Sequence, residues 1–354
     1  MMRHQRWAVN HTPGGNGGRN DTTSSARVVA SGGGRGQNRG MIISASRRTD
    51  IPAFYSDWLR ERLRRGFCLV PNPFNPRQVA RVSLRPADVD ALVLWSKNPR
   101  PLLDHLEELV APGYPCYFQF TLNDYPRWLE PGVPALAERL ETFRRLARHL
   151  GPERVVWRYD PLVFTSVTTH AYHRQAFRRL VDALAGHSRR VVVSIVDFYR
   201  KTERRLGQLA GQGIGVERRP RDNPLTWELL EEMRVLAAGR DLEMFSCADD
   251  LSRAGIPAGA CIDAELLGRL GRQVSARKDP GQRPTCRCAV SRDIGMTDTC
   301  RHGCRYCYAT RDPALAARRH SQHRPRAPVL WQASPAGWPA AASDARLGDE
   351  PGGW

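Results

Sequence analysis

The sequence has no apolar run near the ~20 residues that a helix needs to cross a membrane. Residues 1–40 also lack the short apolar stretch that forms the centre of a secretory signal. We therefore expect a protein that works in the cytoplasm, without a membrane partner. The sequence leaves the oligomeric state open.

Lysine is almost absent: three of the 54 basic residues are lysines, the rest are arginines, and the net charge is +18. A strongly basic chain favours an anionic partner such as nucleic acid. Arginine in place of lysine, together with abundant alanine, glycine and proline, is also typical of a GC-rich genome. Charge alone therefore leaves both interpretations open.

The nine cysteines do not have the setting of a disulfide scaffold, because the chain shows no secretory signal. Most of them gather toward the C-terminal end, which favours metal binding. Cys68 and Cys116 are different, because they lie in apolar, strand-like contexts. We expect these two to be buried core thiols.

Between irregular tails, short apolar segments alternate with amphipathic ones. Strands are predicted at 41–46, 91–95, 116–121, 154–158, 190–196 and 242–246. Helices are predicted near 55–65, 99–110, 134–150, 170–186, 223–239 and 263–270. This alternation is typical of a parallel sheet with helical crossovers. The predicted fold class is therefore α/β, a full or partial TIM-like (β/α) barrel.

The chain is expected to hold one barrel domain, at 41–320, with a cysteine-rich segment at 286–308. Residues 1–40 and 321–354 are rich in small residues and proline and are predicted to be disordered tails. Because residue 41 opens abruptly into an apolar strand, we expect Met41 to be the true start. Within the domain, 67–84 is predicted to be an irregular insertion and 204–223 a loop.

Charged side chains follow the predicted strands directly. The carboxyl ends of the strands form the active-site mouth in α/β barrels. We therefore predict a mouth with both signs of charge, suited to a zwitterionic cofactor and a polar or anionic substrate. The candidate catalytic residues are Arg47, Arg48, Asp50, Lys97, Arg158 and Asp160. For Asp50 and Asp160, helix capping or turn formation is an equal alternative.

The most specific pattern is Cys-Arg-His-Gly-Cys-Arg-Tyr-Cys at residues 300–307, a C-x3-C-x2-C spacing. Structural zinc and ordinary [4Fe–4S] clusters both take four protein ligands. Three thiolates leave one coordination position open, and an open position is reactive. Alternatively, Cys286 and Cys288 complete a four-ligand zinc site together with this loop.

This pattern resembles the cluster loop of radical S-adenosylmethionine (SAM) enzymes, and it is most similar to that of spore photoproduct lyase. The resemblance implies that Cys300, Cys304 and Cys307 hold a [4Fe–4S] cluster and that Tyr306 is the aromatic residue beside the cofactor. It also implies that SAM binds the open iron and, after reduction by a ferredoxin- or flavodoxin-type partner, yields a 5′-deoxyadenosyl radical.

Two features depart from the radical SAM pattern. The strand at 293–296, the cluster loop and the helix at 312–320 come last in the chain, where the superfamily has this unit first. We therefore expect a circular permutation that pairs this unit beside the strand at 41–46. The Gly-Gly-Glu segment that often binds the SAM amino group is also missing. Residues 46–50 stand in its place, and Asp50 is predicted to take that role.

A wider resemblance, over residues 41–310, is to domain-of-unknown-function family 1848 (DUF1848). It is carried by the cysteine region and by Ser44–Pro52, Asn72–Pro76, Trp95–Pro99, Phe118–Asn123, Trp157–Pro161 and Gly259–Asp263. This resemblance supplies no substrate.

Four further cysteines form a full ligand set for a second Fe–S cluster or a zinc ion: Cys247, Cys261, Cys286 and Cys288. One alternative is a hydrogen-donor cysteine of the kind that spore photoproduct lyase uses. For Cys247 and Cys261 another alternative is a buried thiol.

The sequence thus predicts a radical SAM-like iron–sulfur enzyme with an unidentified substrate. Nucleic acid, in a photoproduct-lyase-like repair, is the first candidate, and a peptide or small metabolite is the next. The competing interpretation is a non-catalytic zinc- or Fe–S-binding protein that binds nucleic acid.

Overall fold

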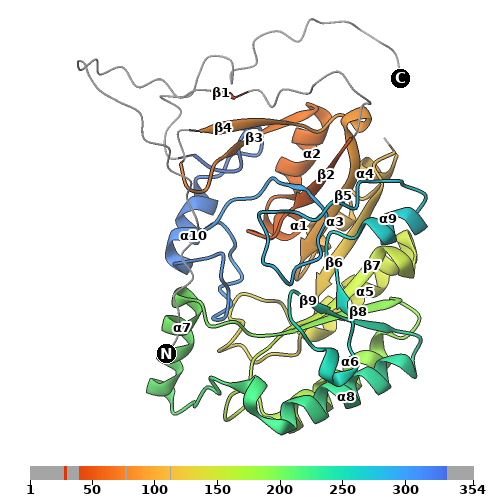
Figure 1. Cartoon of the computed structure of the whole chain (residues 1–354). Helices are drawn as coiled ribbons and strands as arrows, with labels where there is room; N and C mark the ends of the chain where they lie inside the picture. Colours follow the sequence, from red (N-terminus) through yellow and green to blue (C-terminus); the bar gives the residue numbers. More distant parts are fainter. Residues whose placement is uncertain (1–27, 30–39, 76–77, 112, 333–354) are drawn as a thin grey trace, which may run out of the picture.

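The computed structural model describes residues 28–29, 40–75, 78–111 and 113–332. Its centre is an eight-stranded parallel sheet in the order β10-β9-β8-β7-β6-β5-β2-β11. This sheet curls into a half-barrel (Figure 1). Its strands are β2 (Met41–Ala45), β5 (Val89–Ser96), β6 (Cys116–Thr121), β7 (Val155–Leu162), β8 (Arg190–Ile195), β9 (Glu243–Cys247), β10 (Ala258–Gly259) and β11 (Arg292–Asp293). The barrel is therefore partial.

All six strands predicted from the apolar segments are present in this sheet, in chain order from β2 to β9. The main helices also lie where predicted: α2 (Ser56–Arg64), α5 (Leu136–Leu150), α6 (His170–Leu184), α8 (Pro224–Ala238) and α9 (Ala264–Arg269). No helix in the described ranges has the length and apolar character to cross a membrane.

Both faces of the central strands are buried, which explains why the strands are continuously apolar. In β6, Phe118 and Phe120 belong to the large core under the helices, and Phe120 packs against Phe143 of α5. Tyr117, the residue before Phe118, belongs to a second apolar cluster, with Cys261. Successive side chains of a strand point to opposite faces, so this second cluster fills the inside of the half-barrel.

The segment 67–84, predicted to be irregular, is instead an antiparallel hairpin. Its strands are β3 (Phe67–Pro71) and β4 (Val79–Ser83), and β1 (Val28–Val29) pairs with β4. Asn72, Pro73 and Asn75 belong to the connection between the strands, and the residues of β3 and β4 on either side of it form the pairs. Cys68 faces the core and is fully buried, as is Cys116, so the prediction of core thiols is confirmed.

Two other segments differ from their predictions. The helix predicted at 99–110 is divided into α3 (Arg100–Leu103) and α4 (Glu107–Val110), and Leu102, Leu106 and Leu109 still all reach the core. The predicted loop at 204–223 begins inside α7 (Arg200–Gly207) and contains two short 3-10 helices.

The C-terminal unit lies beside the first strand of the sheet, as predicted. Arg292 and Asp293 of β11 pair in parallel with Ile43 and Ser44 of β2, and Ile294 N donates to Ser44 O over 3.0 Å. The cluster loop follows β11, and α10 (Pro313–Ser321) follows the loop. The short α1 (Ile51–Phe54) starts directly after the β2 turn.

The packed chain reaches beyond α10. Leu69 N of β3 donates to Pro328 O over 2.8 Å, and Val329 and Leu330 are buried in the core. Part of the tail predicted from residue 321 is thus packed against the hairpin. The rest of that tail, 333–354, and nearly all of the tail predicted at 1–40 lie outside the described residues.

Candidate functional site

A single cavity of about 460 Å³ lies at the carboxyl ends of the parallel strands. We call it the cysteine cavity. It is lined by residues at the carboxyl-terminal part of β5, β7, β8 and β9, by the turn after β2, and by the cluster loop. Every residue predicted for the site contributes to its wall: Arg47, Arg48, Asp50, Lys97, Arg158, Asp160, Cys247, Cys261, Cys286, Cys288, Cys300, Cys304, Tyr306 and Cys307. Its volume is within the range of small-molecule sites.

One side of the cluster loop rests on the segment that follows β6. His302 O accepts from Gly132 N over 2.9 Å, and Arg305 donates from N to Leu129 O (3.0 Å) and from Nε to Trp128 O (2.8 Å). A Cβ atom at Gly132 would lie 2.6 Å from Arg301 O, which is too close for any other residue. This glycine therefore permits the close approach that supports the loop.

The other side of the loop rests on α7. Arg205 donates from Nη2 to Cys307 O, and Thr202 Oγ1 donates to Tyr306 O over 3.4 Å. The Nε and Nη1 atoms of Arg205 are buried and have no hydrogen-bond partner. Burial lowers the pKa of this guanidinium, and the charges of Cys307 and Cys304 act in the opposite direction. Arg205 is thus a buried cation close to two of the three predicted ligands.

Asp50 joins three parts of the site. Its Oδ1 accepts from Ala53 N (3.0 Å) and caps α1, and its Oδ2 accepts from Lys97 N (2.7 Å). The same Oδ2 lies 2.8 Å from Nε2 of His302 in the cluster loop. Both carboxylate oxygens are thus engaged by the protein. This geometry favours the capping role that was the alternative for Asp50, and it adds a tie to the cluster loop.

Lys97 pairs with Glu130, which the sequence did not point to. Lys97 Nζ lies 2.8 Å from Glu130 Oε1, and Tyr306 donates its hydroxyl to the same oxygen. Burial alone would raise the pKa of Glu130, but the charges of Lys97 and Arg139 hold that pKa below its ordinary value. Glu130 therefore fixes both the cation and the aromatic ring of the loop.

The turn after β2 is anchored by Asp293 of β11. Asp293 accepts from Ser46 Oγ (2.6 Å), Arg47 N (2.7 Å) and Arg48 Nε (3.0 Å). Burial would raise the pKa of this carboxyl, but Arg48 and these hydrogen bonds lower it. A Cβ at Gly295 would lie 2.0 Å from Ser46 Oγ, so the glycine allows β11 to approach this turn.

Arg158 and Asp160, both in β7, form an ion pair in the wall of the cysteine cavity. Their Nη2 and Oδ2 atoms are 2.5 Å apart, and Arg158 is only 4% exposed. Arg158 also donates from Nη1 to Cys261 Sγ over 2.8 Å, and its guanidinium lies 5.1 Å from the ring centroid of Trp95. Burial would lower the pKa of Arg158, but Asp160 and the nearby thiols raise it well above the ordinary value.

All five cations that line the cysteine cavity lie close to an acidic residue. These pairs are Arg47 with Asp293 and Asp279, Arg48 with Asp293, Lys97 with Glu130, Arg158 with Asp160, and Arg283 with Asp197. The wall itself carries these five cations and the carboxylates of Asp50, Asp160 and Asp197, so it has both signs of charge, as predicted for the mouth.

The cysteines fall into two sets. Cys300, Cys304 and Cys307 come from the cluster loop. Burial raises the pKa of Cys300 most, the charge of Asp50 raises it further, and the nearby thiolates of Cys307 and Cys304 add to the effect. Thr310 N donates to Cys307 Sγ over 3.4 Å. The second set is Cys247, Cys261, Cys286 and Cys288, which contact one another. In the described ranges, no group of three or more His, Cys, Asp or Glu residues stands in an arrangement ready to hold a metal ion.

Comparison with known proteins gives one match. No curated protein and no solved structure is similar enough to the chain to count as a match. A family model, described as "Domain of unknown function (DUF1848)", matches residues 42–309. This range covers the whole half-barrel and extends through the cluster loop. The chain therefore belongs to the DUF1848 family.

Proposed function

We propose that this protein is a radical SAM-type iron–sulfur enzyme whose cluster is held by Cys300, Cys304 and Cys307. The observation that carries the proposal is the position of these cysteines. They line one cavity at the carboxyl ends of a parallel half-barrel, on a loop between a strand beside β2 and a following helix. That strand–loop–helix unit comes last in the chain, which agrees with a circularly permuted radical SAM barrel.

The residues around the loop fit an anionic cluster with three thiolate ligands. Arg205 places unpaired, buried N–H groups near Cys304 and Cys307, and a buried cation needs a negative partner. Thr310 N–H points to Cys307 sulfur, as N–H groups do around metal thiolates. When bound, such a cluster supplies the single electron that cleaves SAM reductively. The electron would come from a ferredoxin- or flavodoxin-type partner.

The chain's own residues have three tasks in this proposal. The segment at 128–132 and α7 hold the loop in place from two sides. The charged wall, with Arg48 and Arg158 among its cations and Asp160 among its anions, binds the zwitterionic SAM and orients it. Buried Glu130 and Tyr306, with the largely buried Lys97, keep water away from the loop.

The candidate substrates are nucleic acid and, next to it, a smaller polar molecule. Because the cations of the cavity wall are already paired with acids, none of them favours a phosphate backbone over another polar substrate. Binding of DNA that weakens steeply with added salt would favour nucleic acid, since phosphate contacts release counterions.

A non-catalytic zinc knuckle made of Cys286, Cys288 and the cluster loop is the less favoured function. Cys288 contacts Cys261 and Cys286, so these cysteines already group with the second set. The loop cysteines are left with an incomplete set of three, which suits a centre with an open position.

Electron paramagnetic resonance of the anaerobically reconstituted, reduced full chain tests the proposal. We expect a [4Fe–4S]⁺ signal whose shape changes when SAM is added and which is lost in Cys304→Ala. Cys68→Ala, which removes a core thiol, serves as the matched control and should keep the signal. A cluster signal that ignores SAM would indicate electron transfer instead. Zinc in the loop without any cluster would rule out the proposal.

A further inference from the structure

The second set of cysteines forms a continuous group of sulfur atoms. Cys247 Sγ lies 3.0 Å from Cys261 Sγ. The thiols of Cys261 and Cys286 both lie close enough to that of Cys288 to interact with it. We call these residues the four-thiol group. All four line the cysteine cavity, and all are free thiols.

Three separate parts of the chain deliver these thiols. Cys247 ends β9, and Cys261 follows β10. The backbone of Cys261 is held from β6, because its carbonyl accepts from Tyr117 OH (2.6 Å) and Gln119 Nε2 (2.9 Å). Cys286 and Cys288 come from a long segment between α9 and β11 that contains neither helix nor strand.

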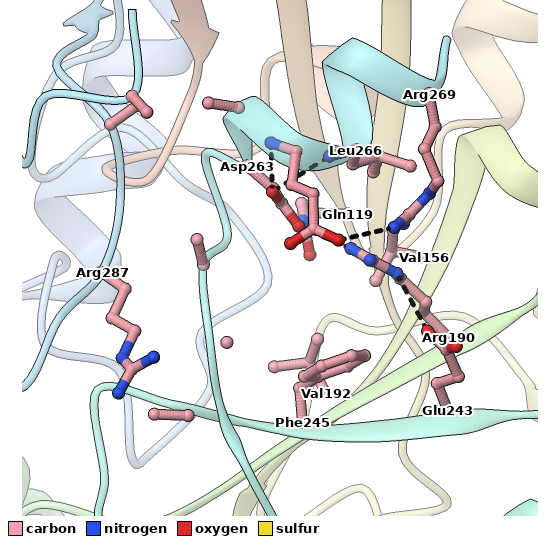
Figure 2. A pocket seen from close by; sticks show the side chains of 17 residues that line it. Gln119, Val156, Arg190, Val192, Glu243, Phe245, Asp263, Leu266, Arg269 and Arg287 are labelled. Atoms are coloured by element: carbon pink, nitrogen blue, oxygen red, sulfur yellow. Dashed lines mark hydrogen bonds and ion pairs between the residues drawn. The ribbon is translucent and has the colours of Figure 1, made fainter.

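This irregular segment divides the inside of the half-barrel into two compartments. Cys286 and Cys288 line the cysteine cavity, while Arg287 and Ala289 line a second cavity of about 410 Å³ toward the other end of the strands. Figure 2 shows this second cavity, with Arg287 across from the Arg190–Asp263 ion pair (2.5 Å). Successive side chains of an extended backbone point to opposite sides. Residues 286 to 289 alternate in this way, so the thiols of Cys286 and Cys288 both face the cysteine cavity.

Positive groups surround the four-thiol group. Arg158 donates to Cys261 Sγ over 2.8 Å, and Ile262 N donates to Cys288 Sγ over 3.4 Å. Arg47 interacts electrostatically with Cys288, and Arg283 does so with Cys247. Neutral core thiols need no such surroundings, whereas four metal-bound thiolates carry net negative charge that these groups would balance.

We propose that Cys247, Cys261, Cys286 and Cys288 together bind one divalent metal ion of the zinc type, in tetrahedral geometry. This inference does not depend on the proposed radical SAM function. Zinc–sulfur bonds of about 2.3 Å put the sulfurs of a tetrahedral site about 3.8 Å apart. The contact of 3.0 Å between Cys247 and Cys261 reaches this spacing when the two sulfurs separate by less than about 1 Å.

The spacing of the sulfurs favours a single ion over a second iron–sulfur cluster. A cubane of four irons lies between its ligands and needs them much farther apart than the 3.0 Å between the sulfurs of Cys247 and Cys261. A single ion also has a structural task here. The segment from 271 to 291 forms no helix or strand, and a compact domain seldom holds so long an irregular stretch without a fixing element. The metal would fasten this partition to β9 and to the segment after β10.

Metal analysis of the purified full chain tests the inference, with zinc and iron measured separately. We expect about one zinc per chain, and a fall of about tenfold or more in Cys247→Ser/Cys288→Ser. Cys304→Ala should keep the zinc while it loses the loop cluster, so failure of this inference can be told apart from failure of the proposed function. Cys116→Ser is the matched control for the loss of a buried thiol.

A second measurement keeps the test valid where a variant fails to fold. The wild-type chain is stripped with a chelator and titrated with Co²⁺, and the visible bands of tetrahedral cobalt thiolate should saturate at about one equivalent. Iron in two distinct clusters, with no zinc, would overturn the inference. A disulfide between Cys247 and Cys261 in the freshly isolated protein, found by mass spectrometry, would overturn it as well.

Discussion

His302, in the middle of the cluster loop, places its Nε2 atom 2.8 Å from Oδ2 of Asp50, and both side chains are almost fully buried. Asp50 caps α1 and also accepts from Lys97 N at the end of β5. One carboxylate thus ties the loop that carries three cysteines to two neighbouring strands of the sheet. The cluster loop comes last in the chain, and this contact is part of what joins it to the first strand.

Replacement of Asp50 by alanine should therefore loosen the loop as well as the helix. We expect a loss of about 2–4 kcal/mol in unfolding free energy, because a cap is lost and several buried donors are left without an acceptor. Urea unfolding measures this loss. Asp312→Ala, which removes an exposed cap of α10, is the control and should cost only about 1 kcal/mol. Equal losses in the two variants would contradict a role beyond capping.

Gly132→Ala should displace the cluster loop without changing any polar group. The added Cβ would lie 2.6 Å from Arg301 O and 2.9 Å from His302 O, and the backbone cannot move away at low cost. We expect a destabilisation of about 1–3 kcal/mol and a clear fall in iron content after reconstitution. In the control, Gly268→Ala, the Cβ meets nothing within 4 Å. Full iron loading of Gly132→Ala would show that the close approach is not required.

The sequence predicted the strands and the residues at their ends for one physical reason. A strand that is buried on both faces is apolar for most of its length, and polar side chains gather toward its carboxyl end. Arg48 and Lys97 were found in this way, since each follows such a strand. Arg158, predicted to end the strand at 154–158, lies inside β7, which continues to Leu162. Because the carboxyl ends of parallel strands meet at one edge, these residues line one cavity in the structure.

The residues that the sequence missed are those whose position depends on a loop path. Glu130 follows a strand by nine residues, within a proline-containing turn, and only the fold brings it to Lys97 and Tyr306. The grouping of Cys286 with Cys261 likewise depends on how an irregular segment crosses the half-barrel. The hairpin at 67–83 was missed because the prolines and asparagines of its connection outweighed two short apolar strands.

Lys97 and Glu130 should stabilise the folded protein only when both are present. Loss of one partner leaves the other charge buried, which costs about 3–5 kcal/mol. We expect such losses in Lys97→Met and in Glu130→Leu, the two single variants of a double-mutant cycle. The double variant Lys97→Met/Glu130→Leu should be more stable than Lys97→Met alone. Additive losses, measured by denaturant unfolding, would show that the two side chains do not interact.

Glu130 also predicts how stability depends on pH. Its pKa in the folded protein lies below the ordinary value of 4.5, because Lys97 and Arg139 outweigh the effect of burial. A lowered folded pKa means that the stabilisation is fully present above the ordinary value. It is then lost as the pH falls through the folded pKa.

We therefore expect the unfolding free energy of the wild type to fall between about pH 5 and about pH 3 by more than that of Glu130→Gln, which cannot ionise at this position. The difference should be about 1.4 kcal/mol for each unit by which the pKa is lowered. Asp293, whose pKa is also lowered, contributes equally in both proteins and cancels in the comparison. Unfolding by urea at a series of pH values measures the two curves. If the two curves of unfolding free energy against pH are parallel, Glu130 has the same pKa in the folded and unfolded chains. In that case Lys97 does not stabilise its ionised form.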